Sequence, residues 1–118
     1  MILVDTSVWI DHLRKGNPRL RTLLYENKVL SHPFIIGELA CGNLRNRAEI
    51  LGLLQALPAA RVANHEEVLA FVESQRLYGR GLGWIDIHLL ASALLSTSVL
   101  WSLDKEMVQA ATVLKISG

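Results

Sequence analysis

The stretch Ile2-Leu3-Val4-Asp5-Thr6-Ser7 decides the fold of this 118-residue chain. Its first three residues form a short apolar run without polar alternation, which is typical of a strand buried on both faces of a parallel sheet. Asp5 follows at once, and the two hydroxyl residues after it begin a helix-like segment. In open α/β sheets, ligands bind beyond the carboxyl ends of the strands. We therefore expect Asp5 to lie at a ligand-binding edge.

Strand-like and helix-like segments alternate along the rest of the chain. Further short strands are expected at 28–31, 61–62, 98–101 and 113–117, and helices at 8–15, 18–26, 33–43, 46–57, 66–78, 85–96 and 104–111. Such alternation predicts one α/β domain over residues 1–118, a three-layer α/β/α sandwich with a mainly parallel central sheet.

The composition is that of a folded globular protein, with 51% hydrophobic and 19% charged residues. Cys41 is the only cysteine, which excludes an internal disulfide and a multi-cysteine zinc site and fits a reducing, intracellular compartment. The N-terminal residues do not resemble a signal peptide, because Asp5 and Asp11 interrupt the apolar run. The apolar span 84–101 contains Asp86 and His88, so we expect a buried helix and strand there and no membrane segment.

Four acidic residues interrupt the helix and strand patterns. Asp5 directly follows the first strand, and Asp104 comes three residues after the strand that ends at Trp101, so both are expected near one edge of the sheet. On helical wheels, two other acids fall on apolar faces: Glu38 among Phe34, Ile35, Cys41 and Gly42, and Asp86 among Leu89, Leu90 and Ala93. An unpaired carboxylate that faces a core is costly and normally neutralises or finds a cation.

Each acid also has a purely structural explanation. Asp5, Asp86 and Asp104 lie at or near expected helix starts and could cap those helices. Glu38 would instead need a buried basic partner. Because four separate explanations are less economical than one shared site, we favour a functional cluster.

A cluster of carboxylates repels phosphate, and hard divalent cations remove that repulsion. Mg²⁺ and Mn²⁺ prefer oxygen ligands and can activate a bound water for attack on a phosphodiester. We expect Thr6 and Ser7 to hold Asp5 or a metal-bound water, and Ser102 to do the same for Asp104. The expected chemistry is metal-dependent phosphodiester hydrolysis.

The chain resembles the PIN-domain ribonucleases, specifically VapC-type toxins of toxin–antitoxin pairs. The segments that carry the resemblance run in family order: Ile2–Asp11, Ile36–Leu39, Trp84–Asp86 leading into Leu89–Ala93, and Leu100–Lys105. The resemblance implies that Asp5, Glu38, Asp86 and Asp104 are the catalytic, metal-binding quartet. One departure is Ser102, where the family usually has threonine, but the hydroxyl is kept.

The partners are also implied by this resemblance. They are an RNA substrate, commonly a structured one such as transfer RNA, a small antitoxin whose tail enters the acidic groove, and a second copy of the chain in a homodimer. The cofactor implied is Mg²⁺ or Mn²⁺, in a cytoplasmic protein. Eight of the twelve basic residues are arginines, which suit phosphate recognition, and Arg80 and Arg14 are the candidates for RNA contact.

Three other interpretations remain open. A phosphoacceptor receiver domain would have an acidic pair after the first strand, and a haloacid-dehalogenase-type phosphatase would have a second aspartate where Ser7 stands. A catalytically inactive PIN-like module that binds RNA or protein would keep the fold without turnover. The four acids together argue against the last of these.

Overall fold

The protein, described here by a computed structural model of residues 1–118, is built on a three-stranded parallel sheet. The strands are β1 (Ile2–Val4), β2 (Val29–Leu30) and β3 (Val99–Trp101), in the order β2-β1-β3. In the β1–β3 pair, Ile2 lies opposite Val99 and Val4 opposite Trp101. Both strands therefore end at the same edge, immediately before Asp5 and Ser102.

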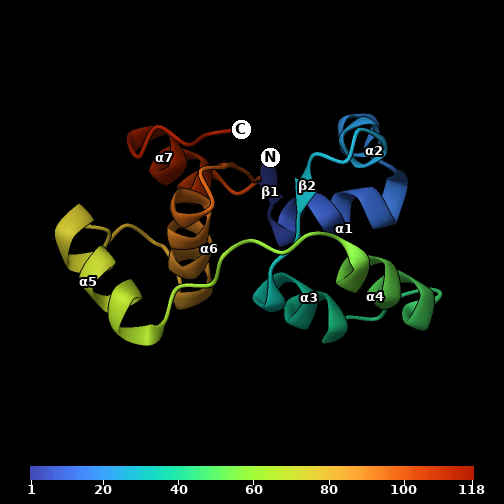
Figure 1. Ribbon diagram of the computed structural model, residues 1–118, viewed down its shortest axis with the longest axis horizontal. Helices are drawn as coiled ribbons and strands as arrows, with labels where there is room; N and C mark the ends of the chain where they lie inside the picture. The colour runs from blue at the N-terminus through green and yellow to red at the C-terminus, as the bar shows by residue number, and fades with distance from the viewer.

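Seven helices cover the two faces of this sheet and complete the predicted three-layer α/β/α domain. Helices α5, α6 and α7 lie on one side of the strands and α1 to α4 on the other (Figure 1). Their bounds are α1 Thr6–Lys15, α2 Pro18–Tyr25, α3 Pro33–Ala40, α4 Arg47–Ala56, α5 His65–Gln75, α6 Trp84–Leu95 and α7 Lys105–Val113.

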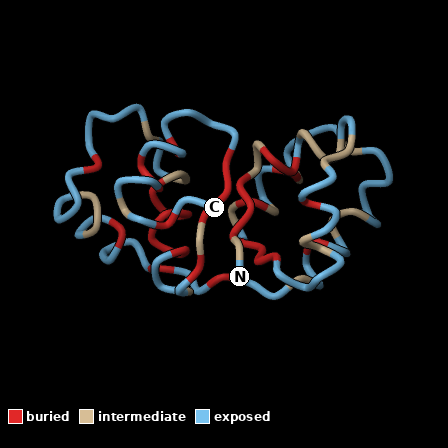
Figure 2. Tube along the Cα trace, turned by 90° about the horizontal axis from the view of Figure 1, so that it is seen from above, coloured by how far each residue is buried: buried red, intermediate tan, exposed pale blue.

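The core follows from the apolar runs of the sequence. Leu3 and Val4 of the central strand are fully buried, as a strand covered by helices on both faces requires. The span 84–101 forms α6 and β3, as predicted, and the residues from Ile87 to Ala93 are all buried. Buried segments run through the middle of the molecule while the outer helices are mostly exposed (Figure 2). No helix here combines the length and the apolar character that crossing a membrane requires.

The strands predicted at 61–62 and 113–117 are not observed, because the chain in each region meets the sheet through only one bridge. The chain after α4 touches the sheet only through a single bridge between Ala59 and Ser31, and it has left the sheet before residues 61–62. Near the C-terminus, α7 continues to Val113, so only Ser117 forms a bridge, with Leu100. Helix α3 is also shorter than expected and ends at Ala40.

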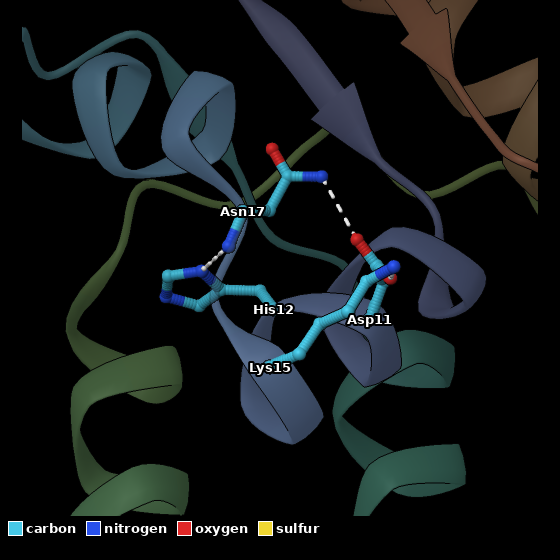
Figure 3. A network of polar contacts seen from close by, with 4 residues as sticks. All are labelled: Asp11, His12, Lys15 and Asn17. Carbon is cyan, nitrogen blue, oxygen red and sulfur yellow. Dashed lines mark hydrogen bonds and ion pairs between the residues drawn. The ribbon is translucent and has the colours of Figure 1, made fainter.

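The turn between α1 and α2 is fixed by a small polar network (Figure 3). The Asn17 backbone N–H donates to Nδ1 of His12 at 3.0 Å, and its side-chain amide donates to Asp11 at 3.1 Å. Lys15 forms an ion pair with the same carboxylate at 3.3 Å. The amide of Asn17, followed by Lys15, keeps the pKa of Asp11 below its usual value. The carboxylate of Asp11 therefore has partners both in α1, through Lys15, and across the turn, through Asn17.

Candidate active site

Asp5 lies where the two longest strands end together. Its backbone N–H donates to the carbonyl of Trp101 at 2.9 Å, which extends the β1–β3 pairing, and the residue is 6% exposed. Asp5 occupies the N-cap position of α1, but its side chain caps nothing. Instead, its Oδ2 accepts hydrogen bonds from the hydroxyls of Ser102 at 2.7 Å and Ser7 at 2.9 Å. The other oxygen, Oδ1, is left for a ligand.

Each of these hydroxyls is oriented by a backbone donor. The N–H of Leu103 donates to Oγ of Ser7, and the N–H of Asp104 donates to Oγ of Ser102, both at 3.0 Å. A hydroxyl that accepts such a bond directs its own proton elsewhere, here to Asp5. Ser7 thus holds Asp5 as predicted. The prediction for Ser102 needs correction, because its hydroxyl binds the carboxylate of Asp5 and only the backbone of Asp104.

Asp104 combines a capping role with a place at this edge. It is the N-cap of α7, and its Oδ1 accepts from the N–H of Glu106 at 3.2 Å. The capping interpretation is therefore correct for this residue. It does not exclude another role, since the side chain is exposed and one oxygen suffices for the cap.

Glu38 does not lie on a buried face, so the helical-wheel prediction was wrong. The residue is exposed, while Ile35 and Leu39 are the buried residues of α3. Because nearly every residue from Phe34 to Cys41 is apolar, the wheel had no polar side to orient it. Glu38 is nevertheless at the same edge, because Oγ1 of Thr6 donates to its Oε1 at 2.7 Å. Thr6 was expected to hold Asp5 or a metal-bound water, and its hydroxyl instead donates to Glu38.

Asp86 is partly buried in the first turn of α6. Its Oδ2 accepts the backbone N–H of Gly83 at 2.9 Å, so it ties the helix start to the preceding loop. The pKa of Asp86 is raised, first by burial and then by the negative charges of Asp5 and Asp104, although the Gly83 bond opposes the shift. Asp5 and Asp104, from two other segments, therefore both repel the carboxylate of Asp86.

Gly83 was not singled out by sequence reasoning. The signal was present, since a residue three positions before an acid in the first helical turn can donate its N–H to that acid. His88, expected in the core, is buried with its ring against those of Phe34 and Trp84.

The acids share an edge but do not form a closed ligand cluster. No three His, Cys, Asp or Glu side chains are close enough together to hold one metal ion among them. This arrangement still fits a hydrated Mg²⁺ or Mn²⁺ ion, because Mg²⁺ keeps several waters and needs only one or two carboxylates. The free Oδ1 of Asp5 and the raised pKa of Asp86 both favour a cation here.

The two candidate RNA-contact arginines lie on opposite sides of these acids. Arg80 is exposed on the loop before α6, where its Nε donates to the carbonyl of Arg76 at 3.0 Å. The same loop approaches α7, because a Cβ added to Gly81 would lie 3.2 Å from Cγ of Glu106. Arg14, on α1, instead lines a cavity of about 800 Å³ that Glu38 also borders.

Comparison with known proteins gives a consistent result. The model of the PIN domain family matches residues 2–113. The chain is 48% identical over 108 residues to proteins named Ribonuclease VapC32 from two strains of Mycobacterium tuberculosis, CDC 1551 and H37Rv. These matches cover 91% of this chain and 87% of each relative.

Proposed function

Since this chain belongs to the PIN-domain family and to the VapC-type ribonucleases within it, we propose that its acidic edge cleaves RNA with the help of Mg²⁺ or Mn²⁺. The protein is an endoribonuclease, the toxin of a toxin–antitoxin pair. The observation that supports the metal requirement is the repulsion of the Asp86 carboxylate by those of Asp5 and Asp104. A bound cation would relieve this repulsion.

Asp5, Glu38, Asp86 and Asp104 are the proposed metal-binding and catalytic residues. A bound divalent ion would lower the pKa of a water and stabilise charge on the scissile phosphate. Ser7 and Ser102 keep Asp5 rigid with its Oδ1 directed away from the hydroxyls, and Thr6 does the same for Glu38 through Oε1. These three hydroxyl residues are positioning groups.

The arginines would hold the substrate against an edge that repels it. Phosphates on either side of the scissile bond meet four carboxylates, so binding needs cations beside them. Arg80 extends from the loop next to Asp86, and Arg14 from the side of Glu38. Both side chains are exposed and can contact RNA backbone.

The remaining partners are part of the same proposal. We propose that a cognate antitoxin inhibits the protein by covering the acidic edge, that the substrate is a structured RNA such as transfer RNA, and that the active form is a homodimer. A cytoplasmic location is supported by the RNA substrate and by the single, exposed Cys41.

The test is cleavage of total RNA by purified protein with Mg²⁺, with Mn²⁺ and with EDTA. Asp5→Asn, Asp86→Asn and Asp104→Asn should each abolish cleavage, because each removes a metal-directed charge with little change in shape. Glu73→Gln is the matched control, since Glu73 is an exposed acid on α5. Full activity in two of the three aspartate variants, or in EDTA, would show that the four-acid site is wrong.

A further inference from the structure

A cavity of about 800 Å³ opens beside Glu38, between α1, α3 and the segment that leads into α4. Its walls include the apolar residues Ile10, Leu13, Leu39, Leu44 and Ile50. Its polar lining consists of Arg14, Arg45, Asn43 and Asn46 together with Glu38. The volume lies in the range of small-molecule binding sites. The cavity therefore joins apolar walls to two cations at the border of the acidic edge.

Neither cation of the cavity forms an ion pair within the protein. The ion pairs of the chain are Lys15–Asp11 and Lys28–Glu26, and neither involves Arg14 or Arg45. Asp11, the acid nearest in sequence to Arg14, lies within electrostatic reach of Arg14, but its direct contacts are with Lys15 and Asn17 (Figure 3). Glu38 receives the hydroxyl of Thr6. Two guanidinium groups therefore remain available for an anionic ligand.

The segment that carries Arg45 is held in place by its neighbour. The guanidinium of Arg47 donates to the carbonyl of Gly42 at 3.1 Å and also to the carbonyl of Ala40. Asn46 has a left-handed backbone conformation, with φ of 51°, which turns the chain into α4. Arg47 thus supports the loop, while Arg45 is exposed at the cavity.

The cavity lies along α1 from the acidic edge, where an RNA strand bound at the acids could continue. Thr6 contacts Glu38 at the start of α1, and Arg14 follows eight residues later, roughly 12 Å along the helix axis at 1.5 Å per residue. Ile10 and Leu13 line the cavity between these two positions. A strand whose scissile phosphate lies at the acids can therefore continue along this face of α1.

We propose that this cavity is a nucleotide subsite of the ribonuclease. It would take the nucleotide next to the scissile phosphate, with its backbone phosphate bound by Arg14 and Arg45 and its base against the apolar wall. Asn43 and Asn46 lie where they can hydrogen-bond to the base edge. The inference rests on the proposed function for its RNA substrate. It adds a role for Arg45 and for the cavity, which the proposed function does not include. A cationic protein segment is disfavoured here, because two arginines would repel it.

The test measures RNA binding without turnover. In an Asp86→Asn background, the full chain is titrated with a short, fluorescein-labelled single-stranded RNA of mixed sequence at several salt concentrations. The double variant Arg14→Ala/Arg45→Ala removes the contact with one phosphate, so it should weaken binding and flatten the salt dependence by about 0.7 units of slope. At 0.1 M salt, this slope corresponds to a loss of affinity of roughly 5-fold.

Arg61→Ala is the matched control. Arg61 is exposed, and its backbone N–H donates to Oγ of Ser96, the C-cap of α6. Asp86 lies in the first turn of that helix, so Arg61 is at the other end of α6 from the acidic edge. Its loss should leave both affinity and salt slope nearly unchanged. If the double variant behaves like this control while the wild type cleaves RNA, the subsite is wrong and the ribonuclease site stands. If the wild type neither binds nor cleaves RNA, both proposals fail.

A second probe separates RNA from an acidic protein partner. Poly-glutamate peptide should bind more weakly than the RNA, because it has no base for the apolar wall. Equal affinity for both probes, with the same loss in the double variant, would identify a general anion-binding surface and overturn the nucleotide assignment.

Discussion

Neutralising Asp86 separates the charge of this carboxylate from its hydrogen bond. Asp86→Asn keeps an oxygen that can accept the N–H of Gly83, now 2.9 Å away, and removes the charge that Asp5 and Asp104 repel. Asp86→Ala removes both. The two variants therefore report separately on a functional cluster and on a helix cap.

The magnitudes follow from the contacts. Relief of a functional acidic site typically stabilises by about 1 kcal/mol, and solvent screening of the partly exposed Asp86 keeps the gain near this value. Loss of one hydrogen bond costs about 1 kcal/mol. In EDTA at neutral pH, Asp86→Asn should thus gain about 1 kcal/mol, roughly 3–6 °C in Tm for a chain of this size, and Asp86→Ala should stay near the wild type.

The sign of the pH dependence is fixed by the raised pKa of Asp86. The folded protein holds this proton to higher pH than the unfolded chain, so ionisation costs stability as pH rises above the usual value of 3.8. The advantage of Asp86→Asn should accordingly be small in acid and fully present at neutral pH.

Thermal melts in EDTA and in Mn²⁺ provide the assay. Mn²⁺ should stabilise the wild type by mass action, and it should stabilise Asp86→Asn less. A pure capping role for Asp86 makes a different prediction, namely no gain for asparagine and a loss of about 1 kcal/mol for alanine, with or without metal. That pattern, with no shift of any curve by Mn²⁺, would refute the acidic-site reasoning.

Substitutions at three further positions test other parts of the molecule. Ser102→Ala should destabilise by about 2 kcal/mol and reduce cleavage, because the buried Asp5 loses a 2.7 Å hydrogen bond, whereas Ser102→Thr should retain both properties in melts and activity assays. Burial lowers the pKa of His32 to about 4, so stability should fall as the pH drops from 6.5 to 4. His32→Asn should reduce this dependence in urea unfolding at pH 7 and pH 5, and His88, whose pKa burial also lowers, should account for what remains. Arg80→Ala should flatten the salt dependence of RNA binding by roughly one unit of slope, unlike Arg61→Ala.

The parts of the fold that could be predicted are those that local sequence determines. The uninterrupted apolar run Ile2–Val4 is the observed β1, and Pro18 begins α2 as its fixed φ favours. Bridges by single residues, such as Ser31 to Ala59, have no such signal, because they depend on where a distant segment passes the sheet edge. For this reason the strand at 61–62 was predicted two residues too late.

In the candidate site, too, the features that follow from local sequence could be predicted, and those that depend on distant segments could not. Asp5 and Asp104 could be placed at one edge because each follows a recognisable strand. The partners of the hydroxyls could not be assigned, because the bond from Ser102 to Asp5 spans 97 positions and depends on the register of β1 with β3. The exposure of Glu38 could not be predicted for a local reason. The residues around it in α3 are nearly all apolar, so a helical wheel cannot indicate which side of the helix faces solvent.

The position of β1 between β2 and β3 has a consequence for the order of folding. The central strand can pair early with β2, but β3 follows it only after nearly a hundred residues. Pairings so far apart in sequence form slowly, because a long loop must close first. Ser102, which fixes Asp5, leaves the ribosome 97 positions after it. A nascent chain that has not yet extended past Ser102 therefore has no assembled cleavage site, and the RNA of the translating cell meets an active enzyme only after β3 has paired with β1.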